Sequence, residues 1–361
     1  MGPASPEVFS SGVEAFLEDA LVRSKILGSM EGKECCELTD SHQSCPDPSL
    51  FLLTGIPGLE SQHVWIAIPV CLMYVLALLG NGAVLFVVKQ DVTLHEPMYY
   101  FLSMLAVIDL VFSTAVVPKM LSIFWLDSRE ISYESCFLQM FFIYTFAAVE
   151  SGVLLAMAID RYVAICNPLR YKAILTNPKI ALIGLLSLAR AVGVMTPFIC
   201  FLTSLPYCKS TVIPHSYCEH MAVVDLAGTD SSVSDKYSVV VATTLVGGDA
   251  ICITFSYGMI LRSVLRLSSH EARLKAFSTC GSHLCVILLF FVGGLLSMYI
   301  EMLDLGLPRH IQVLLADLYL VIPPMLNPVV YGLKTKQIRE RVFKLFRQRQ
   351  DLAEPRMDGG H

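Results

Sequence analysis

Seven long apolar stretches are the feature of this sequence that most restricts how the chain can fold. Each is long enough to cross the hydrocarbon core of a bilayer, which is about 30 Å thick and needs about 20 helical residues. Because lipid offers the backbone no hydrogen-bond partners, each stretch must be helical. We therefore predict an all-α membrane protein, a bundle of seven transmembrane helices. The predicted spans are residues 64–88, 97–123, 134–160, 180–204, 237–261, 276–300 and 312–333.

The composition and the distribution of charge support a membrane location. Hydrophobic residues make up 55% of the 361 residues and charged residues only 16%, which is too apolar for a soluble domain of this size. Seventeen lysines and arginines fall on one side of the predicted bundle and seven on the other. Because positively charged loops stay in the cytoplasm, we expect the N-terminus outside, the C-terminus in the cytoplasm and a multi-pass protein of the plasma membrane.

Three regions follow from this topology. Residues 1–60 are an extracellular N-terminal segment, polar and acidic, and we expect disorder up to about residue 49. Residues 61–333 are the transmembrane domain, and residues 334–361 are a cytoplasmic tail with a short amphipathic helix. The N-terminal segment lacks the pattern of a cleaved signal peptide, so we expect the first span to direct membrane insertion.

Two acidic residues, Asp109 and Glu150, fall inside predicted spans two and three. Two carboxylates at membrane depth repel each other unless a cation or a shared proton lies between them. A bound structural Na⁺ is one solution, and no other cofactor is expected. A protonated pair, hydrogen-bonded to Asn81 and Ser151, is the alternative. We expect Asn81, on span one, to find its partner on span two.

The third span ends in Asp160-Arg161-Tyr162, a charged group at the exit of an apolar helix. Such a group belongs at a membrane surface, where Arg161 can reach headgroups, water or a protein partner. An ion pair with Asp160 can hold Arg161 at rest and release it when the helix ends part. In span seven, Asn327-Pro328 removes one helical donor and predicts a hinge.

An ordered set of short motifs carries a family resemblance from Phe51 to Phe346. The set resembles the odorant receptors of the rhodopsin-like G-protein-coupled superfamily, and two further stretches resemble their fish-like class. The resemblance implies a small odorant ligand, a heterotrimeric stimulatory G protein, a rise in cAMP, a lipid bilayer and no nucleic acid. The motifs are Gly80-Asn81, LHEPMYYFL with Asp109, MAIDRYVAIC with PLRY, Ser256-Tyr257, KAFSTCGSH (Lys275 to His283) and PPMLNPVVY (Pro323 to Tyr331); the two further stretches are PSLFLLTGIPGLE (Pro48 to Glu60) and HSYC (His215 to Cys218).

The resemblance also assigns roles at the cytoplasmic end. Tyr257 and Tyr331 would swing inward to join Arg161 in the active state, and the segment from Lys275 to His283 would move with span six and contact the G protein. The full set expected to serve coupling and activation is Asp160, Arg161, Tyr162, Tyr257, Lys275, His283, Asn327, Pro328 and Tyr331.

At the outer end, the family pattern implies a disulfide between Cys136 and Cys218 that holds the second outer loop over the ligand pocket. The family usually adds a bridge within that loop, but Gly228 stands where a partner of Cys208 is expected. Cys208 is therefore free or paired with a cysteine of the N-terminal segment.

Helical spacing and depth below Cys136 predict the ligand-binding residues. The alternative is that these stripes only pack against other helices. The nearest base beyond span six is Arg309, in a loop, whereas Glu301 lies at the end of the span; we therefore expect neutral ligands, with Tyr144 or Ser151 as the polar contact. The predicted set is Tyr144, Ala147, Ala148 and Ser151 on span three, Val241 and Leu245 on span five, and Phe291, Leu295, Met298 and Met302 on span six.

The sequence carries none of the metal, nucleophile or phosphate-binding motifs common in enzymes, so we do not expect an enzyme. The rival interpretation is a transporter or channel in which Asp109 and Glu150 mark an ion path. Transporters usually show internal repeats with matched broken spans, and this chain shows neither.

Overall fold

The structure is a computed structural model that describes residues 49–207, 209–227, 232–266, 269–302, 306–334 and 339–341. The predicted N-terminal disorder, Cys208, Gly228 and most of the tail with its predicted amphipathic helix lie outside these residues. Inside the described helices, the side chains of 232–235, 272, 275, 278–279, 299, 301–302 and 333–334 are also not described.

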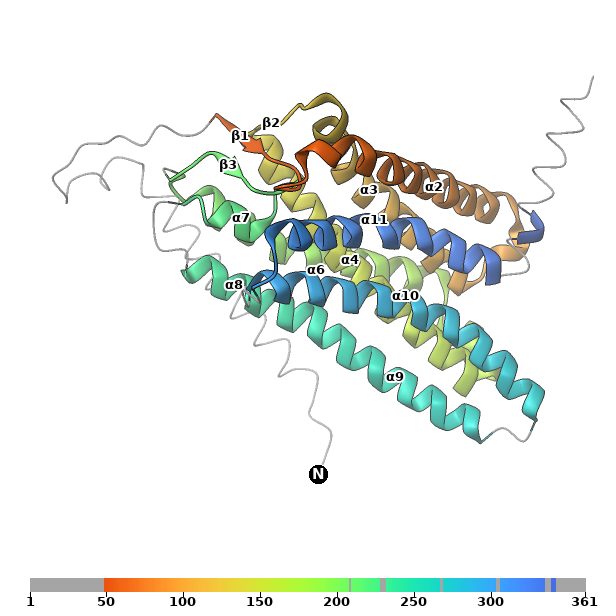
Figure 1. The fold of residues 1–361 in the computed structure, drawn as a ribbon. Coiled ribbons are helices and arrows are strands. Elements are labelled where there is room, and N and C mark those ends of the chain that lie inside the picture. Colours follow the sequence, from red (N-terminus) through yellow and green to blue (C-terminus); the bar gives the residue numbers. More distant parts are fainter. Residues whose placement is uncertain are drawn as a thin grey trace, which may run out of the picture. The chain divides into compact units, whose positions relative to one another are not determined.

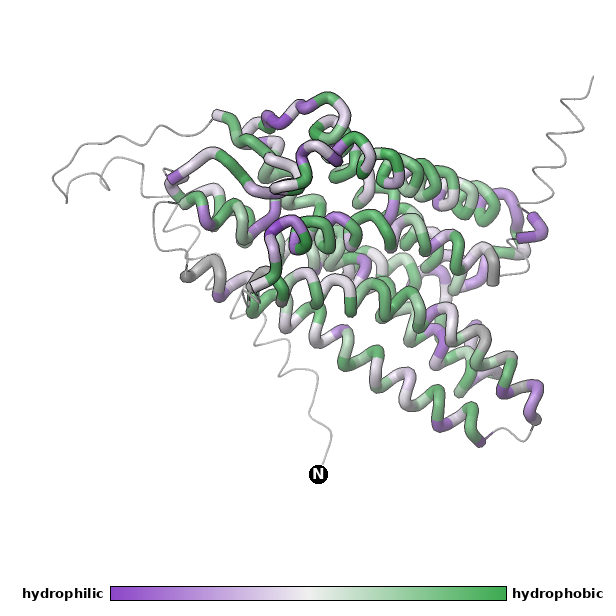
Figure 2. Tube along the Cα trace, in the orientation of Figure 1, coloured by the Kyte–Doolittle hydropathy of each residue, from purple (hydrophilic) through white to green (hydrophobic). Residues whose placement is uncertain are grey.

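Seven helical spans long and apolar enough to cross a membrane are present in this part of the chain, as predicted (Figure 1). Most extend a few residues past the predicted ends. Hydrophobic residues run along the helices, while hydrophilic ones gather toward their ends and the connecting segments (Figure 2). The spans are α2 (His63–Gln90), α3 (Pro97–Leu126), α4 (Tyr133–Cys166), α6 (Asn177–Thr203), α8 (Ser232–Ala242) continued by the π-helical η4 (Thr243–Gly247) and α9 (Gly248–Leu265), α10 (His270–Met302) and α11 (Arg309–Lys334).

Short helices and strands complete the described residues. The helical turns are η1 (Glu60–Gln62), η2 (Val92–Leu94), η3 (Pro168–Arg170), α5 (Tyr171–Ile174) and α7 (His220–Val224). The strands are β1 (Leu50–Leu53), β2 (Glu130–Ser132) and β3 (Val212–Ile213).

Local chemistry sets several helix ends. Pro97 opens α3 in its first turn, where a missing N–H costs nothing. Asp127 ends the same helix with φ of 51°, in the left-handed region. The hydroxyl of Ser132 accepts a bond of 3.2 Å from the N–H of Ser135 and so caps the start of α4.

The bundle is organised around α4, which packs against α3, α6, α9 and α10. Helix α11 packs against α2 and closes the ring, and the two run side by side in Figure 1. Large apolar side chains face outward as well, among them Trp65, Leu185 and Ile251, with 72%, 63% and 72% of their surface exposed. An apolar exterior of this kind is what a bilayer requires.

A three-stranded sheet in the order β2-β1-β3 covers one end of the bundle, which we call the sheet end. Strand β1 pairs antiparallel with β2 and parallel with β3. Phe51 and Leu53 point into the core while Leu50 and Leu52 are exposed, the alternation of a half-buried strand. Gly55 follows with φ of +77°, and an added Cβ would lie 2.5 Å from the His63 ring, so only glycine fits this turn.

Candidate functional site

An apolar cavity of about 210 Å³ lies within the bundle. Its walls come from α3, α4, α6, the α8–η4 segment, α10 and α11, and residues on either side of Cys218 in sequence, including α7, contribute to the lining. Few polar groups reach it, among them Tyr144, Ser238 and Ser297. A small, mostly apolar cavity with a few polar groups is typical of a site for a small molecule.

Eight of the ten residues predicted to bind ligand line this cavity. The side chain of Met302 lies outside the described residues, and Ser151 is not part of the cavity lining. Position in the lining is a necessary condition for contact, and the binding role of each residue stays a prediction. The eight are Tyr144, Ala147, Ala148, Val241, Leu245, Phe291, Leu295 and Met298.

Ser151 does not line the cavity, contrary to the prediction that it is a polar contact for the ligand. It is fully buried, and its hydroxyl donates a hydrogen bond of 2.7 Å to Oδ2 of Asp249 on α9. The hydroxyl is therefore used in a contact between helices.

Asp249 also forms an ion pair within the bundle, with Arg190 on α6. Nη1 and Nη2 of Arg190 donate to the two carboxylate oxygens at 2.9 and 2.7 Å. The carboxylate of Asp249 is buried, and about a third of the Arg190 side chain is exposed. This pair was not predicted from the sequence, although opposite charges in two membrane spans were a usable signal.

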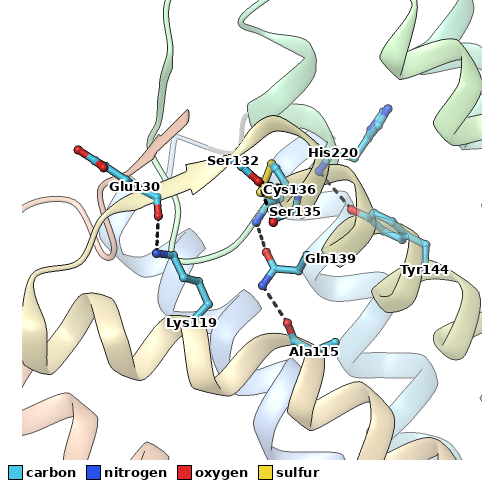
Figure 3. The surroundings of a disulfide bond; sticks show 10 residues. Ala115, Lys119, Glu130, Ser132, Ser135, Cys136, Gln139, Tyr144 and His220 are labelled. Carbon is cyan, nitrogen blue, oxygen red and sulfur yellow. Dashed lines mark hydrogen bonds between the residues drawn. A yellow bond between two sulfur atoms is a disulfide. The ribbon is translucent and has the colours of Figure 1, made fainter. Parts of the chain in front are cut away.

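The loop between α6 and α8 is fixed beside the cavity by the predicted disulfide, Cys136–Cys218, which is present. Gln139, one turn along α4, accepts a bond of 3.0 Å from the N–H of Cys218 and donates one of 2.9 Å to the carbonyl of Ala115 (Figure 3). The hydroxyl of Tyr144 accepts a bond of 3.2 Å from the N–H of His220. The loop is therefore bound to α4 at three points.

Two histidines of this loop are almost completely buried. Desolvation lowers the pKa of His215 from its ordinary value of 6.5 to about 4, with a smaller opposing effect from Glu219. Burial also lowers the pKa of His220 to about 4. Both rings are neutral at physiological pH.

Several lining residues could not be found from helical spacing on spans three, five and six. Phe112, Phe198 and Tyr319 come from other helices, and Glu219 and His220 from the loop. For the last two, direct sequence proximity to Cys218 was a usable signal.

Of the two carboxylates inside the membrane spans, Asp109 forms hydrogen bonds to a residue that was not predicted as a partner. Nδ2 of Asn327 donates to both oxygens of Asp109, at 3.0 and 3.1 Å. Glu150 is buried, and its Oε1 has no hydrogen-bond partner among the described residues. The alternative that a protonated pair is hydrogen-bonded to Asn81 and Ser151 is wrong in its partners, because both side chains bond elsewhere.

Asn81 bonds to α11, and the prediction of a partner on the second span is wrong. Its Nδ2 donates to the carbonyl of Pro324 at 2.9 Å and to that of Ala77 on its own helix at 3.0 Å. Pro328 has no N–H, so the carbonyl of Pro324 four residues earlier loses its helical donor. Asn81 replaces that donor, and the missing Cβ of Gly80, which would lie 2.7 Å from Pro328, allows the close approach.

The end of α4 opposite the sheet carries the Asp-Arg-Tyr motif. Arg161 donates to Oδ2 of Asp160 through Nε at 2.9 Å and through Nη2, and the hydroxyl of Tyr171 donates to Oδ1 at 2.7 Å. Asp160 is buried, so the pair is held away from solvent. Tyr162 packs on Ile260 of α9 and its apolar neighbours.

A second polar cluster joins α9, α10 and α11 near this end. The hydroxyl of Tyr257 and Nδ1 of His283 lie 2.6 Å apart. The Tyr331 ring is 6.5 Å from the His283 ring, and its buried hydroxyl has no hydrogen-bond partner within the described residues. The structure therefore brings Tyr257, His283 and Tyr331 together, while the side chain of Lys275 is not described.

Seven membrane-spanning helices, an apolar cavity in the bundle and an Asp-Arg-Tyr ion pair at the end opposite the sheet define a G-protein-coupled receptor. A family model described as "Olfactory receptor" matches residues 70–349. The human olfactory receptor 52K2 is 50% identical over 309 residues, which cover 86% of this chain and 98% of the relative. Human olfactory receptor 52K1 is 51% identical over 302 residues, covering 84% and 96%. The chain belongs to the olfactory receptor family: it is a multi-pass membrane receptor for a small molecule, coupled to a G protein, and not an enzyme.

Proposed function

We propose that this receptor binds a small, neutral, volatile odorant and activates a stimulatory, olfactory-type G protein, which raises cAMP. The observation that carries the proposal is the charge of the cavity lining. Among the described lining residues there is no lysine or arginine, Glu219 is acidic, and His220 is neutral because burial lowers its pKa to about 4. A carboxylate ligand would lose its hydration here without gaining a countercharge.

Tyr144 is the proposed polar contact, because its hydroxyl belongs to a residue of the cavity lining and already bonds to the loop. A hydroxyl both donates and accepts, so it suits an alcohol, ketone, ester or lactone. With Ser151 occupied by Asp249, Tyr144 is the candidate that remains of the two predicted from the sequence.

Activation is proposed to run from the cavity to the opposite end through α9 and α10. Leu245 of η4 and Phe291 of α10 line the cavity. Further along the same two spans, Tyr257 of α9 and His283 of α10 are in contact. A ligand that shifts one helix against the other would separate this pair, and Tyr257 could then approach Arg161 as that residue leaves Asp160. This route leads to Asp160, Arg161 and Tyr162 as the G-protein contact.

In the proposed orientation, the protein lies in the plasma membrane with its sheet end outside the cell and its Asp-Arg-Tyr end on the cytoplasmic side. Its support is the excess of lysine and arginine on the latter side. A disulfide at the sheet end agrees with this orientation, since such bonds persist in oxidising compartments.

A structural Na⁺ near Asp109 and Glu150 is also proposed. No group of three or more His, Cys, Asp and Glu side chains in the described part of the chain is suited to a metal ion. A monovalent cation needs fewer charged ligands than a divalent metal ion. Oε1 of Glu150 and Oδ1 of Asn327 are buried oxygens without a hydrogen-bond partner among the described residues. These oxygens, with Asp109, would hold the ion, which would supply the positive charge that two neighbouring carboxylates lack.

The ligand proposal is tested by a dose–response series in which an alcohol, an ester and an acid of equal chain length are applied to cells with a cAMP reporter. We expect the neutral compounds to activate at concentrations at least about tenfold lower than the acid, since one uncompensated charge costs more than 1.4 kcal/mol. A clear preference for the ionised acid would overturn the proposal. Arg161→Ala is the control for G-protein signalling: surface expression should remain and the response disappear, whereas Arg170→Ala, at an exposed position, should respond normally.

A further inference from the structure

Two hydroxyl groups of the cavity lining have no hydrogen-bond partner among the described residues. They belong to Ser297 on α10 and Tyr319 on α11, whereas the proposed polar contact Tyr144 lies on α4. Both side chains are half-buried, and neither hydroxyl is sealed inside the protein as the unpartnered hydroxyl of Tyr331 is. A ligand in the cavity can therefore reach both groups.

The position of Tyr319 depends on a pair of glycines in α10. A Cβ on Gly293 would lie 2.9 Å from Cδ2 of the Tyr319 ring, and one on Gly294 would lie 2.8 Å from its hydroxyl oxygen. The Phe290 ring also packs against it, with the two centroids 6.4 Å apart. Because only residues without a Cβ leave this space, the glycines allow the phenol to lie against α10, with its hydroxyl beside the lining residue Gly294.

Ser297 belongs to the same part of the wall. It stands three residues beyond Gly294, close to one helical turn, so the two residues share a face of α10, and both line the cavity. The phenol of Tyr319 lies deep within the bundle, so the surface that it keeps faces the cavity rather than lipid. We call the hydroxyls of Ser297 and Tyr319 the α10–α11 patch.

The size of the cavity brings a ligand into contact with this patch. A volume of about 210 Å³ equals that of about seven water molecules at about 30 Å³ each, which suits a ligand of roughly seven to ten non-hydrogen atoms. A ligand that fills this space with an apolar chain covers both hydroxyls without bonding to them, and a polar group covered in this way costs free energy. A ligand with a second polar group satisfies the patch instead.

We propose that the receptor selects ligands with two hydrogen-bonding groups, one bound by Tyr144 and the other by the α10–α11 patch. The second group is a carbonyl or hydroxyl oxygen, because either can accept bonds from both hydroxyls of the patch. Diols, hydroxy ketones and hydroxy esters carry such a pair of groups on a short apolar spacer. This inference rests on the proposed function, since it takes the cavity as the odorant site and keeps the ligand neutral.

The test uses cells that express the full-length receptor with a cAMP reporter. Heptanol is compared with hexanediol, which has a hydroxyl at each end and the same number of non-hydrogen atoms. Diols and hydroxy ketones with shorter and longer spacers are included, each paired with the monofunctional alcohol or ketone of equal size. We expect the best difunctional compound to act at a concentration at least about fivefold lower than its pair, because a site built to bond a group discriminates against analogues that lack it.

Two variants remove the patch one hydroxyl at a time. Tyr319→Phe and Ser297→Ala should each reduce the preference for the difunctional compound at least about fivefold. The loss should fall on the difunctional compound, since an apolar chain makes no bond to the patch. Tyr74→Phe removes a hydroxyl on α2 that bonds to Thr114 outside the cavity lining, and this control should keep the preference. Surface expression is measured for each variant.

The comparison on the unmodified receptor decides the question even if a variant fails to reach the surface. Equal potency of the paired compounds, or no response to any difunctional compound, overturns the inference and leaves the proposed function in place. A preference that survives both variants also overturns it, because the second group then bonds elsewhere. A response only to the ionised acid of equal chain length would reject the proposed function, and this inference with it.

Discussion

The ion pair of Arg190 and Asp249 illustrates how single residues fix contacts between helices. It is a two-point contact from α6 to α9, and Ser151 of α4 adds a third helix. The pair needs space: a Cβ on Gly152 would lie 2.8 Å from Oγ of Ser187 and 3.1 Å from Nη2 of Arg190. Gly152 is therefore the residue that allows Arg190 to approach α4.

Removal of one partner should destabilise the receptor. We expect Asp249→Asn to lower the free energy of unfolding by roughly 2 kcal/mol, because it removes the charge that pairs with the partly exposed Arg190 and weakens two charge-assisted hydrogen bonds. Thermal unfolding in detergent measures this loss. The double variant Arg190→Gln with Asp249→Asn should regain part of it, and Asp225→Asn, at an exposed position, is the matched control. Equal melting temperatures of Asp249→Asn and the unmodified receptor would show that the pair contributes nothing.

Residue-level prediction from the sequence succeeded where one helix decides the outcome. Helical spacing on α4 correctly predicted that Tyr144, Ala147 and Ala148 share the cavity, since the period of 3.6 residues sets which side chains point together. It failed for Ser151 because the competing partner, Asp249, is about a hundred residues away and belongs to another helix. The Cys136–Cys218 disulfide was predicted from the family resemblance, which carries information about pairs that lie far apart in the sequence.

Among the elements, the π-helical turn η4 was not predicted from the sequence. Val241 and Leu245 were expected to line the cavity at α-helical spacing, and they do; Leu245 and its lining neighbour Val246 lie within the π turn itself. A π turn depends on the backbone hydrogen bonds of one segment, which no hydrophobic pattern reports. The replacement of a helical donor of α11 by Asn81 is similar: the need for a partner was predictable, and its position on α11 was not.

The loop between α6 and α8 should lose stability in acid. Burial lowers the pKa of both His215 and His220 to about 4, from 6.5. Between pH 6.5 and 4 these histidines are protonated in the unfolded chain and neutral in the folded loop. The free energy of unfolding therefore falls as the pH falls from 6.5 toward 4. The slope is about 1.4 kcal/mol per pH unit for each histidine.

Thermal unfolding at pH 7.5, 6 and 5 measures this dependence. The variant His215→Gln with His220→Gln should lose less stability between pH 7.5 and 5 than the unmodified receptor. His270→Gln, at an exposed position of α10, keeps the full dependence and serves as control. An identical pH dependence in the double variant would contradict the assignment to these two residues.

At the scale of the whole molecule, three helices converge on the buried carboxylates. Asp109 lies on α3, Glu150 on α4 and Asn327 on α11, so an ion bound among them would join all three. If Na⁺ stabilises the resting bundle, replacing NaCl with choline chloride should raise basal cAMP. The variant Asp109→Asn with Glu150→Gln keeps the side-chain sizes and should abolish this Na⁺ dependence, while Asp225→Asn should retain it. Insensitivity of the unmodified receptor to Na⁺ would favour a shared proton instead.

The overall fold was largely predictable because the membrane leaves few alternatives. Apolar stretches of about 25 residues in lipid must be helical, so length and hydropathy alone gave all seven spans. Outside the lipid this constraint disappears, and the three-stranded sheet, with β1 drawn from the N-terminal segment, was not foreseen. Its strands have two to four residues each, too short for an alternating pattern to be distinguished from chance.

The position of β1 in the middle of that sheet has a consequence for synthesis. Leu50–Leu53 is made first, but its partner β3 begins at Val212, about 160 residues later, which is a delay on the order of 10 to 30 s at ordinary rates of translation. Until then β1 has at least one unpaired edge, a state in which strands bind other chains. The first strand to emerge from the ribosome is thus the last to have both of its edges paired. The fourth span must be synthesised before the sheet can form completely.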